Sequence, residues 1–214
     1  MPTKLTAPFI VFITLVSIGA GVYFYPALPA RIVSHWDMAG NVNGFMGKFW
    51  GVALIPIIEL IVLLFYFVIP VIDPHKQNFW LFRKEYNMFF VLMALFLFAI
   101  EMMIILWNTG VHFNMIEIIL PMIGILFFYI GVLFHYTKPN WFVGIRTPWT
   151  LSSPQVWDKT HALGGNLFKI AGAIACLGML VPAYGVWFII VPALGVSLFL
   201  VIYSFIVYQK VVTH

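Results

Sequence analysis

Residues 138–165 read KPNWFVGIRTPWTLSSPQVWDKTHALGG, a stretch in which charged side chains and three tryptophans crowd together. The sequence on both sides consists of long apolar runs that a lipid bilayer would accept. We therefore expect the function of the chain to concentrate in this stretch, and the apolar runs to hold it in place.

The stretch predicts local structure of its own. Ser153, like the serine before it, can cap a helix, Pro154 suits the first turn, and the glycine pair 164–165 suits the end. Within that short helix, Trp157 and His161 are four residues apart and therefore share one face. We predict a short helix that ends before the next apolar run begins.

Just upstream, Pro148 favours an extended backbone at Thr147, so GIRTP is expected to be an extended lead-in that presents Arg146. An arginine beside exposed tryptophans is the usual composition of an interface anchor. This composition predicts a docking surface for a partner protein. The alternative is that the tryptophans form an interfacial belt that fixes the loop to lipid headgroups.

Composition excludes a water-soluble domain. Hydrophobic residues make up 63% of the 214 residues and only 8% are charged, so a core of this size cannot hide the apolar surface. We predict an all-α integral membrane protein whose main partner is the lipid bilayer. The basic residues are spread along the chain and form no stripe, so direct binding to nucleic acid is not expected. The lone Cys176 can build neither a disulfide nor a zinc site within one chain.

Six apolar runs are each long enough to cross a bilayer as a helix. They cover residues 8–25, 51–72, 88–107, 115–134, 166–181 and 187–208. Six spans put both termini on the same side, and cytoplasmic termini leave only Arg31 and Lys48 outside among the eleven basic residues. This bias predicts a plasma-membrane protein with a cytoplasmic N-terminus and C-terminus, and it places residues 138–165 in the cytoplasm.

Two carboxylates fall inside the predicted spans, Glu59 in the second and Glu101 in the third. A charged side chain at the centre of a bilayer costs about 3 kcal/mol on insertion scales. We therefore expect both groups to face the interior of the bundle and either to find a partner or to take up a proton. They also support an alternative function, a small proton-coupled transporter, although the sequence lacks broken helices and a clear intramembrane polar path.

Residues 73–87, between the second and third spans, form a basic segment with Lys76, Arg83 and Lys84. We expect this segment to lie along anionic headgroups. In that arrangement Phe79, Trp80 and Phe82 would dip into the lipid.

A second polar stretch covers residues 30–49, and its candidate functional residues are His35, Trp36, Asp37, Gly40, Asn41 and Gly44. We predict a tight, turn-rich loop at the outer interface, anchored by Trp36, Phe49 and Trp50. The GNVNG run has part of a calcium-loop pattern, but Ala39 and Trp50 stand where the pattern needs carboxylates. His35 and Asp37 alone are weak evidence for a metal, so no metal site is predicted.

Catalysis is not expected from this chain. It contains no HExxH, no nucleophile elbow, no phosphate-binding glycine loop and no second carboxylate beside Asp158. We therefore predict neither an enzyme nor a bound cofactor.

The run NWFVGIRTPWTL at residues 140–151, followed by VWDKTH and a glycine pair, closely resembles the SdpI family of multi-pass immunity proteins. The stretch YPALPARIVSHWDMAGNVNGFMGK at residues 25–48 resembles the small domain that commonly precedes the SdpI region. Together the two motifs extend the resemblance over almost the whole chain. They suggest an N-terminal two-span domain at 1–72, a basic segment with the third span at 73–113, and an SdpI-like three-span region at 114–214.

The resemblance implies a function on both sides of the membrane. Characterised SdpI-like proteins protect the producing cell from a secreted peptide toxin, and they act as a membrane receptor that sequesters a cytoplasmic transcriptional repressor. An outer surface would thus sense or block the toxin while the cytoplasmic loop holds the repressor. Carried over by matching motif, the partner-binding positions are Asn140, Gly144, Arg146, Thr147, Pro148, Trp149, Thr150, Trp157, Thr160, His161 and Gly165. Asn43 stands where the family pattern has Asp after the valine, which further weakens a metal role.

Overall fold

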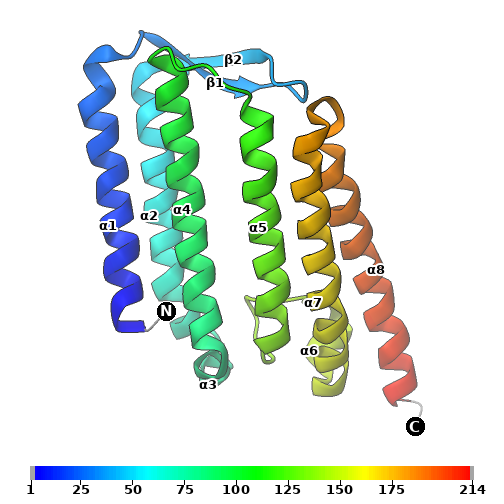
Figure 1. Cartoon of the computed structure of the whole chain (residues 1–214). Helices are drawn as coiled ribbons and strands as arrows, with labels where there is room; N and C mark the ends of the chain where they lie inside the picture. The colour runs from blue at the N-terminus through cyan, green and yellow to red at the C-terminus, as the bar shows by residue number, and fades with distance from the viewer. Residues whose placement is uncertain (1–2, 213–214) are drawn as a thin grey trace.

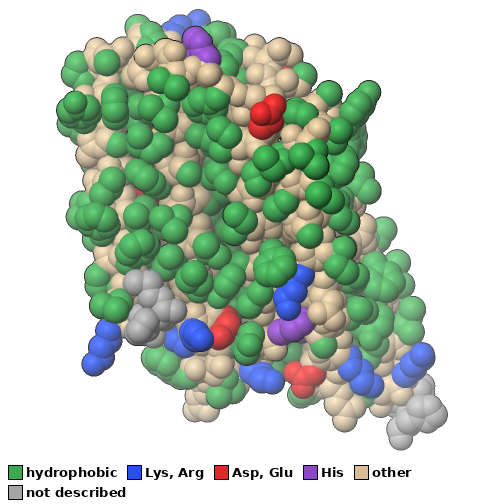
Figure 2. Space-filling model, in the orientation of Figure 1, with side chains coloured by type: hydrophobic (Ala, Val, Ile, Leu, Met, Phe, Trp, Pro, Cys, Tyr) green, Lys and Arg blue, Asp and Glu red, His purple; other side chains and the backbone are tan. Residues whose placement is uncertain are grey.

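The computed structural model describes residues 3–212, and within them six helices are long and apolar enough to cross a membrane. They are α1 (Thr3–Phe24), α2 (Lys48–Ile72), α4 (Arg83–Asn108), α5 (Met115–Tyr136), α7 (Pro154–Leu177) and α8 (Trp187–Val212). They stand side by side, and apolar side chains cover most of the face in view (Figures 1 and 2). This confirms the predicted multi-pass, all-α membrane protein.

The spanning helices form two groups. Helices α1, α2 and α4 pack against one another, as do α5, α7 and α8, and the contact between α4 and α5 joins the groups (Figure 1). In α1 the buried side chains recur every three or four residues, so one face packs against α2 and α4. These residues are Thr6, Ile10, Ile13, Thr14, Ser17 and Gly21.

Gly124 and Gly131, which lie two turns apart on α5, let α5 and α7 approach closely. A Cβ on Gly124 would lie 2.6 Å from the Gly172 carbonyl oxygen, and one on Gly131 would overlap the Gly165 carbonyl oxygen. Small residues at a helix interface allow close backbone contact inside a membrane. The contact with α5 therefore fixes where α7, and the polar residues at its N-terminal end, must lie.

The predicted end point of the helix that begins after Ser153 is wrong. Helix α7 begins at Pro154, with Ser153 as its N-cap, and runs without a break to Leu177. The short helix and the fifth span, expected from residue 166, therefore form one helix that passes through the glycine pair 164–165.

Packing explains why these glycines do not end the helix. A Cβ on Gly165 would overlap the His135 ring of α5, and one on Gly164 would lie 2.5 Å from Cδ1 of Ile145. A glycine inside a helix costs stability relative to alanine, but here a neighbouring side chain needs the space. The pair therefore allows both α5 and the loop to pack closely against α7.

A two-stranded antiparallel hairpin covers one end of the bundle, where a turn-rich loop was predicted (Figure 1). Its strands are β1 (Arg31–Trp36) and β2 (Val42–Gly47), and the register shifts between Val33 and Trp36. Ile32 is fully buried against Gly51 of α2, where a Cβ would overlap the isoleucine side chain. This contact seats the hairpin on α2.

The remaining elements are short. They are the helices α3 (Lys76–Phe79) and α6 (Pro148–Ser152) and the 3₁₀ turns η1 (Tyr25–Ala27), η2 (Trp80–Phe82), η3 (Gly178–Leu180) and η4 (Pro182–Tyr184). Both short helices lie at the end of the bundle opposite the hairpin (Figure 1).

The prediction that three aromatic side chains of residues 73–87 dip into lipid is wrong for two of them. Phe79 and Phe82 are buried in the protein core beside Tyr86, and only Trp80 is exposed. Positions 79, 82 and 86 are three and four apart, so successive turns of α3, η2 and α4 present them on one face. The segment is therefore anchored in protein, with Trp80 left on the surface.

Candidate functional site

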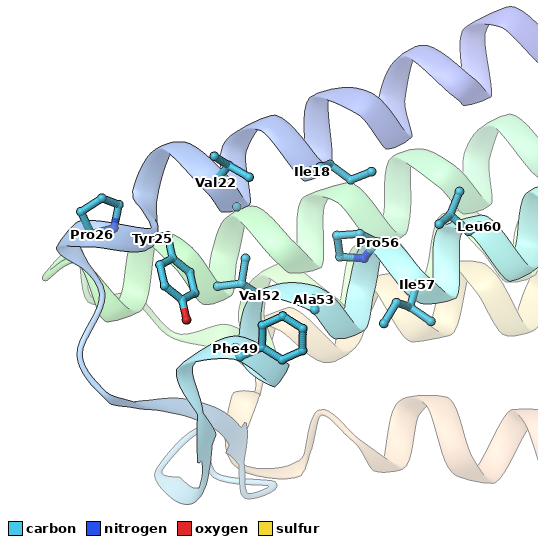
Figure 3. A pocket seen from close by; sticks show the side chains of 11 residues that line it. Ile18, Val22, Tyr25, Pro26, Phe49, Val52, Ala53, Pro56, Ile57 and Leu60 are labelled. Carbon is cyan, nitrogen blue, oxygen red and sulfur yellow. The ribbon is translucent and has the colours of Figure 1, made fainter.

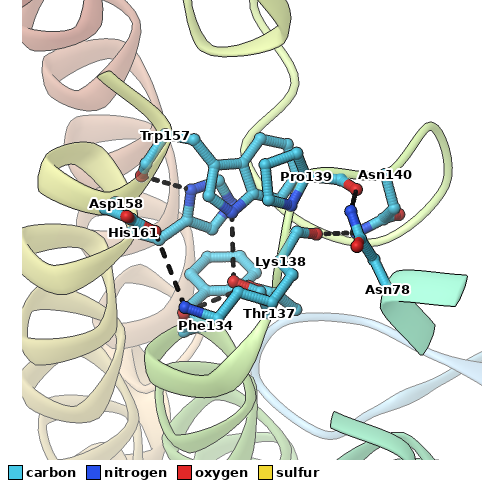
Figure 4. Close-up of polar contacts among 9 residues, drawn as sticks. All are labelled: Asn78, Phe134, Thr137, Lys138, Pro139, Asn140, Trp157, Asp158 and His161. Atoms are coloured by element: carbon cyan, nitrogen blue, oxygen red, sulfur yellow. Dashed lines mark hydrogen bonds and ion pairs between the residues drawn. The ribbon is translucent and has the colours of Figure 1, made fainter. Parts of the chain in front are cut away.

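The segment between α5 and α7 folds around the indole of Trp157, which is fully buried. Its Nε1–H donates to the Thr137 carbonyl oxygen at 3.0 Å, and its ring stacks on His161 with the centroids 4.0 Å apart (Figure 4). The expected shared face of Trp157 and His161 is confirmed. That face points inward, so Trp157 anchors the loop to its own helix.

His161 is held from both ring nitrogens. The backbone N–H of Ile145 donates to Nε2 at 2.9 Å, so Nε2 carries no hydrogen, and Nδ1–H donates to the Trp157 carbonyl oxygen at 2.9 Å. Neutral imidazole with its hydrogen on Nδ1 satisfies both contacts. His161 therefore fastens the extended lead-in of the loop to α7.

Gly144 permits this contact. Its φ of 127° lies in the region that side chains rarely adopt, and a Cβ there would overlap Nε2 of His161. Any other residue would displace the backbone that reaches the imidazole. The role of Gly144 in this structure is thus to let the backbone approach the histidine.

Asn140 organises the first turn of the loop from within, and it is fully buried. Its Oδ1 accepts from the N–H groups of Phe142 and Val143 at 2.9 and 2.6 Å, and its Nδ2 donates to the carbonyl oxygens of Lys138 and Val143 at 2.8 Å each. All the hydrogen-bonding groups of the side chain are used within the loop. Asn140 therefore shapes the turn.

Two residues near the start of α3 tie this loop to the N-terminal half. The buried Asp73 carboxylate accepts from the Trp141 N–H at 2.8 Å, and Asn78 Nδ2 donates to the Pro139 carbonyl oxygen at 2.6 Å (Figure 4). Sequence analysis did not single out either residue. An Asp directly before a proline at the end of an apolar run is the one local signal that marks Asp73.

Helix α6 is held by a threonine pair that sequence analysis assigned no structural role. Thr147 and Thr150 form a reciprocal capping box, and Thr150 Oγ1 also donates to the Ile145 carbonyl oxygen at 2.8 Å. The Thr147 hydroxyl lies 3.0 Å from that of Ser204 on α8. The loop is thereby fixed to the last helix as well.

The predicted docking surface is therefore corrected, because most of its residues lie inside. Trp157 and His161 are buried and are not exposed anchors, and Trp149 packs against Phe205 with ring centroids 5.1 Å apart. The other buried members of the predicted set are Asn140, Thr147, Thr150, Thr160 and Gly165. Among residues 137–165, the Thr160 hydroxyl is the buried side-chain atom without a hydrogen-bond partner.

The surface of the loop is formed by other side chains. Arg146 is exposed, as predicted, and its Nη1 donates to the Trp141 carbonyl oxygen at 2.6 Å, which holds the guanidinium beside the half-exposed indole of Trp141. Pro148 is also exposed. Lys138 and Asp158 approach to 3.9 Å, an exposed ion pair that contributes little to stability.

At the opposite end, the hairpin residues hold one another in place. The Asp37 carboxylate accepts from the N–H groups of Ala39 and Asn41, both at 2.9 Å, and Gly40 makes the turn at φ 84°. The backbone hydrogen bond from Asn41 is the largest cause that lowers the pKa of Asp37 from 3.8. Asp37 therefore shapes this turn.

The other predicted hairpin residues lie on either side of that turn. His35 Nδ1 lies 2.5 Å from Asn43 Oδ1, and Trp36 packs edge-on against Trp107 of α4 with centroids 5.6 Å apart. A Cβ on Gly44 would lie 2.8 Å from Cβ of His35. Within residues 3–212, no three His, Cys, Asp or Glu side chains are grouped as a metal site would require.

Glu59 and Glu101 meet inside the membrane-spanning half of α1, α2 and α4. Both are buried, which confirms that they face the interior of the bundle. The Ser17 hydroxyl lies 2.9 Å from Oε1 of Glu59 and also contacts Oε2 of Glu101. The sequence gives no local signal that Ser17 bridges the two carboxyl groups, because the three residues lie on three different helices.

An apolar groove of about 520 Å³ lies between α1 and α2 near the hairpin end (Figure 3). Among its lining residues only Tyr25 carries a polar side-chain atom, and Gly21 and Val52 form part of the wall. Such a lining suits apolar groups and offers no path to a polar solute.

Comparison with known proteins finds a match for each of two regions of the chain. Residues 137–206, which contain the loop packed around Trp157, match the model of the SdpI/YfhL protein family. Residues 12–60, which contain Ser17, the hairpin and Glu59, match a domain of unknown function, DUF1648.

One curated protein is similar to this chain over almost its whole length. It is the protein named Immunity protein SdpI of Bacillus subtilis (strain 168), which is 25% identical over 201 residues that cover 94% of each chain. No solved structure gives a significant match. The predicted resemblance to the SdpI family, with its preceding small domain, is thus confirmed.

Proposed function

We propose that this membrane protein confers immunity to a secreted peptide toxin and has no enzymatic role. The observation that carries the proposal is the similarity to Immunity protein SdpI over 94% of both chains. Similarity of that extent includes both polar ends of the molecule, the hairpin and the loop. A protective protein that binds its toxin outside the cell and signals inside the cell would use both ends.

The orientation that fits this proposal has both termini in the cytoplasm of a plasma-membrane protein. Lys and Arg side chains gather at the end opposite the hairpin in Figure 2, and nine of the eleven would then be cytoplasmic. The hairpin, with its residues 31–47, would face the toxin. The loop around Trp157 would face the cytoplasm and a transcriptional repressor.

The contact with that repressor is assigned to the exposed side of the loop. Arg146 and Trp141 lie together there, and a guanidinium beside an exposed indole is a typical pair of interface anchors. The buried members of the set, such as Trp157 and His161, would support this surface from below. A change at Arg146 should then affect binding, while a change at Trp157 should affect folding first.

Immunity is tested by survival. The chain is expressed in a Bacillus subtilis strain that lacks its own Immunity protein SdpI, and cells are exposed to the peptide toxin against which that protein protects. Protection is expected, with an empty vector as the control. Equal killing of both strains, with the protein present in the membrane, would contradict the proposed function.

Repressor binding is tested by recruitment of a fluorescent repressor fusion to the membrane in cells exposed to toxin. Arg146→Lys should lower recruitment because an ammonium cannot reproduce the planar guanidinium fork. Ser152→Ala, a change at an exposed position of the neighbouring helix α6, is the matched control. Unchanged recruitment by Arg146→Lys would remove the exposed loop surface from the proposal.

A small proton-coupled transporter is the second candidate, and the observation in its favour is the convergence of Glu59 and Glu101 on Ser17. Proteoliposomes that contain a pH-sensitive dye would report solute-dependent proton movement. Movement that disappears in Glu101→Gln would make transport the primary function.

A further inference from the structure

The carboxyl groups of Glu59 on α2 and Glu101 on α4 touch the same hydroxyl, that of Ser17 on α1. All three side chains are at most 1% exposed. Ser17 and Glu101 are each seven residues from the hairpin ends of their helices, Phe24 and Asn108. At 1.5 Å per residue, the cluster lies about 10 Å below that end.

Counting hydrogens shows that the two contacts require an additional proton. A serine hydroxyl carries one hydrogen and can donate one hydrogen bond, while an ionised carboxylate can only accept. Two ionised carboxylates would leave one of the contacts to Ser17 as an approach of two oxygens without a hydrogen. A proton on one carboxyl repairs this, because that carboxyl donates to Oγ of Ser17, and the hydroxyl donates to the other carboxylate.

The surrounding charges support the same conclusion. Within residues 3–212, the one salt bridge joins Lys138 to Asp158, far from this cluster in the fold. The basic residues of α1, α2 and α4 are Lys4, Lys48, Arg83 and Lys84, and each is more than ten residues along its own helix from Ser17, Glu59 or Glu101. Two negative charges on one hydroxyl would therefore be buried without a counter-charge, which is strongly unfavourable.

Several polar atoms of the cluster are buried without a hydrogen-bond partner. The Thr14 hydroxyl is buried, lies one turn from Ser17 on the same face of α1 and faces Glu59, yet it makes no hydrogen bond of standard geometry. Oε2 of Glu59 and Oε1 of Glu101 are also buried without partners. Buried polar atoms are normally hydrogen-bonded, so the two unpartnered carboxyl oxygens beside one hydroxyl are positions that a further hydrogen can occupy.

We propose that Glu59 and Glu101 form a proton-binding site in the membrane, in which the two carboxyl groups share one proton through Ser17. A shared proton leaves the cluster with one negative charge in place of two. The site does not depend on immunity or on transport, since it concerns the protonation state of the protein in either case. A proton fits better than a metal ion, because only two carboxylates meet here and no third His, Cys, Asp or Glu joins them among the described residues.

Infrared spectroscopy of the full chain in lipid nanodiscs tests the proposal. A protonated carboxyl has a C=O stretch that is separate from the bands of a carboxylate and shifts in D₂O. At neutral pH the wild-type protein should show this band, and the Glu59→Gln/Glu101→Gln double variant should lose it. Gln keeps the shape of Glu and donates an N–H to Ser17, so the double variant should fold.

Glu117→Gln, a change at an exposed carboxylate of α5, is the matched control and should keep the band. A wild-type protein without the band at neutral pH would overturn the proposal without any variant, and so would a band that persists in the double variant. The addition of Na⁺ at constant pH should leave the wild-type band unchanged. Loss of the band on that addition would mean that the pair binds a cation in place of the proton, and would overturn the assignment.

Discussion

The two buried polar clusters of this protein differ in how many of their polar groups have a hydrogen-bond partner. In the loop between α5 and α7, the polar groups of Trp157, His161 and Asn140 all find partners within the protein. In the membrane cluster, Glu59 and Glu101 share one hydroxyl and each keeps an oxygen without a partner. A satisfied network specifies one rigid arrangement, whereas an unsatisfied one responds to what it binds.

This difference assigns the two halves different tasks. The loop is a scaffold whose exposed side chains are available to a partner, and its interior should change little with conditions. The group of α1, α2 and α4 holds the site that should respond to pH. Variants that break one cluster and leave the other intact separate the two tasks.

The largest expected effect comes from the loop. Trp157→Ala should lower the free energy of unfolding by about 3–5 kcal/mol, because it leaves a cavity and removes the bond to the Thr137 carbonyl oxygen and the stacking on His161. The melting temperature of the purified protein measures this. Trp141→Ala, a change at a half-exposed indole of the same loop, is the control and should have a small effect. Equal melting temperatures for Trp157→Ala and the wild type would show that the loop is not packed on this indole.

Variants of the membrane cluster should separate the effect of side-chain charge on stability from the effect of side-chain shape. Glu101→Lys should destabilise the protein by on the order of 3 kcal/mol, because it places a buried ammonium where a single hydroxyl and a carboxyl meet. Glu101→Gln should be tolerated, with a melting temperature close to that of the wild type. Tolerance of lysine, measured as normal yield in detergent, would show that position 101 faces water or headgroups.

The next largest effect on stability is expected from the backbone conformation at Gly144. Gly144→Ala should cost about 1–3 kcal/mol, since φ 127° is strained for alanine and the added Cβ overlaps His161. Gly19→Ala is the matched control, because a Cβ at that helical position meets nothing within 4 Å. The melting temperature of Gly144→Ala should therefore fall below that of the wild type, while that of Gly19→Ala should be unchanged or slightly higher. Equal losses would contradict a specific role for Gly144.

The smallest effect is expected at the hairpin. The pKa of Asp37 is lowered in the folded protein, so the stability it contributes is present above pH 3.8 and is lost as the pH falls through the lowered value. Amide exchange at Ala39 and Asn41 should lose protection in that window. Asp37→Asn keeps an acceptor oxygen that does not titrate, and its protection should not depend on pH there. Identical pH profiles for the two proteins would show that the carboxylate does not hold the turn.

The sequence was sufficient for the fold because each span is a long apolar run with at most one charged side chain, and the small residues Gly124 and Gly131 mark where helices approach. It was not sufficient for the interior of the loop. Trp157 lies beside Asp158 and Lys159 in the sequence, and nothing local shows that its side chain turns inward while theirs stay outside. Burial there depends on the Thr137 carbonyl, which lies in a preceding segment.

Contacts between distant residues were the second limit. Asp73 binds the Trp141 N–H across 68 positions, and Ser17 reaches Glu101 across 84. Residues so far apart share no spacing rule. The predicted helix end at the glycine pair 164–165 was wrong for the same reason. A glycine that ends a helix and one that makes room for His135 look alike in the sequence.

The contrast between a rigid loop and a proton-dependent membrane cluster is tested most directly by hydrogen–deuterium exchange of the nanodisc-embedded protein across a pH series, corrected for the intrinsic exchange rate. As rising pH removes the shared proton, two negative charges meet on Ser17, so protection should fall in α1, α2 and α4 around Glu59 and Glu101. Protection of residues 137–165 should stay constant, and the Glu59→Gln/Glu101→Gln variant should show no such fall. A fall in the loop with no change around the two carboxyl groups would contradict the account.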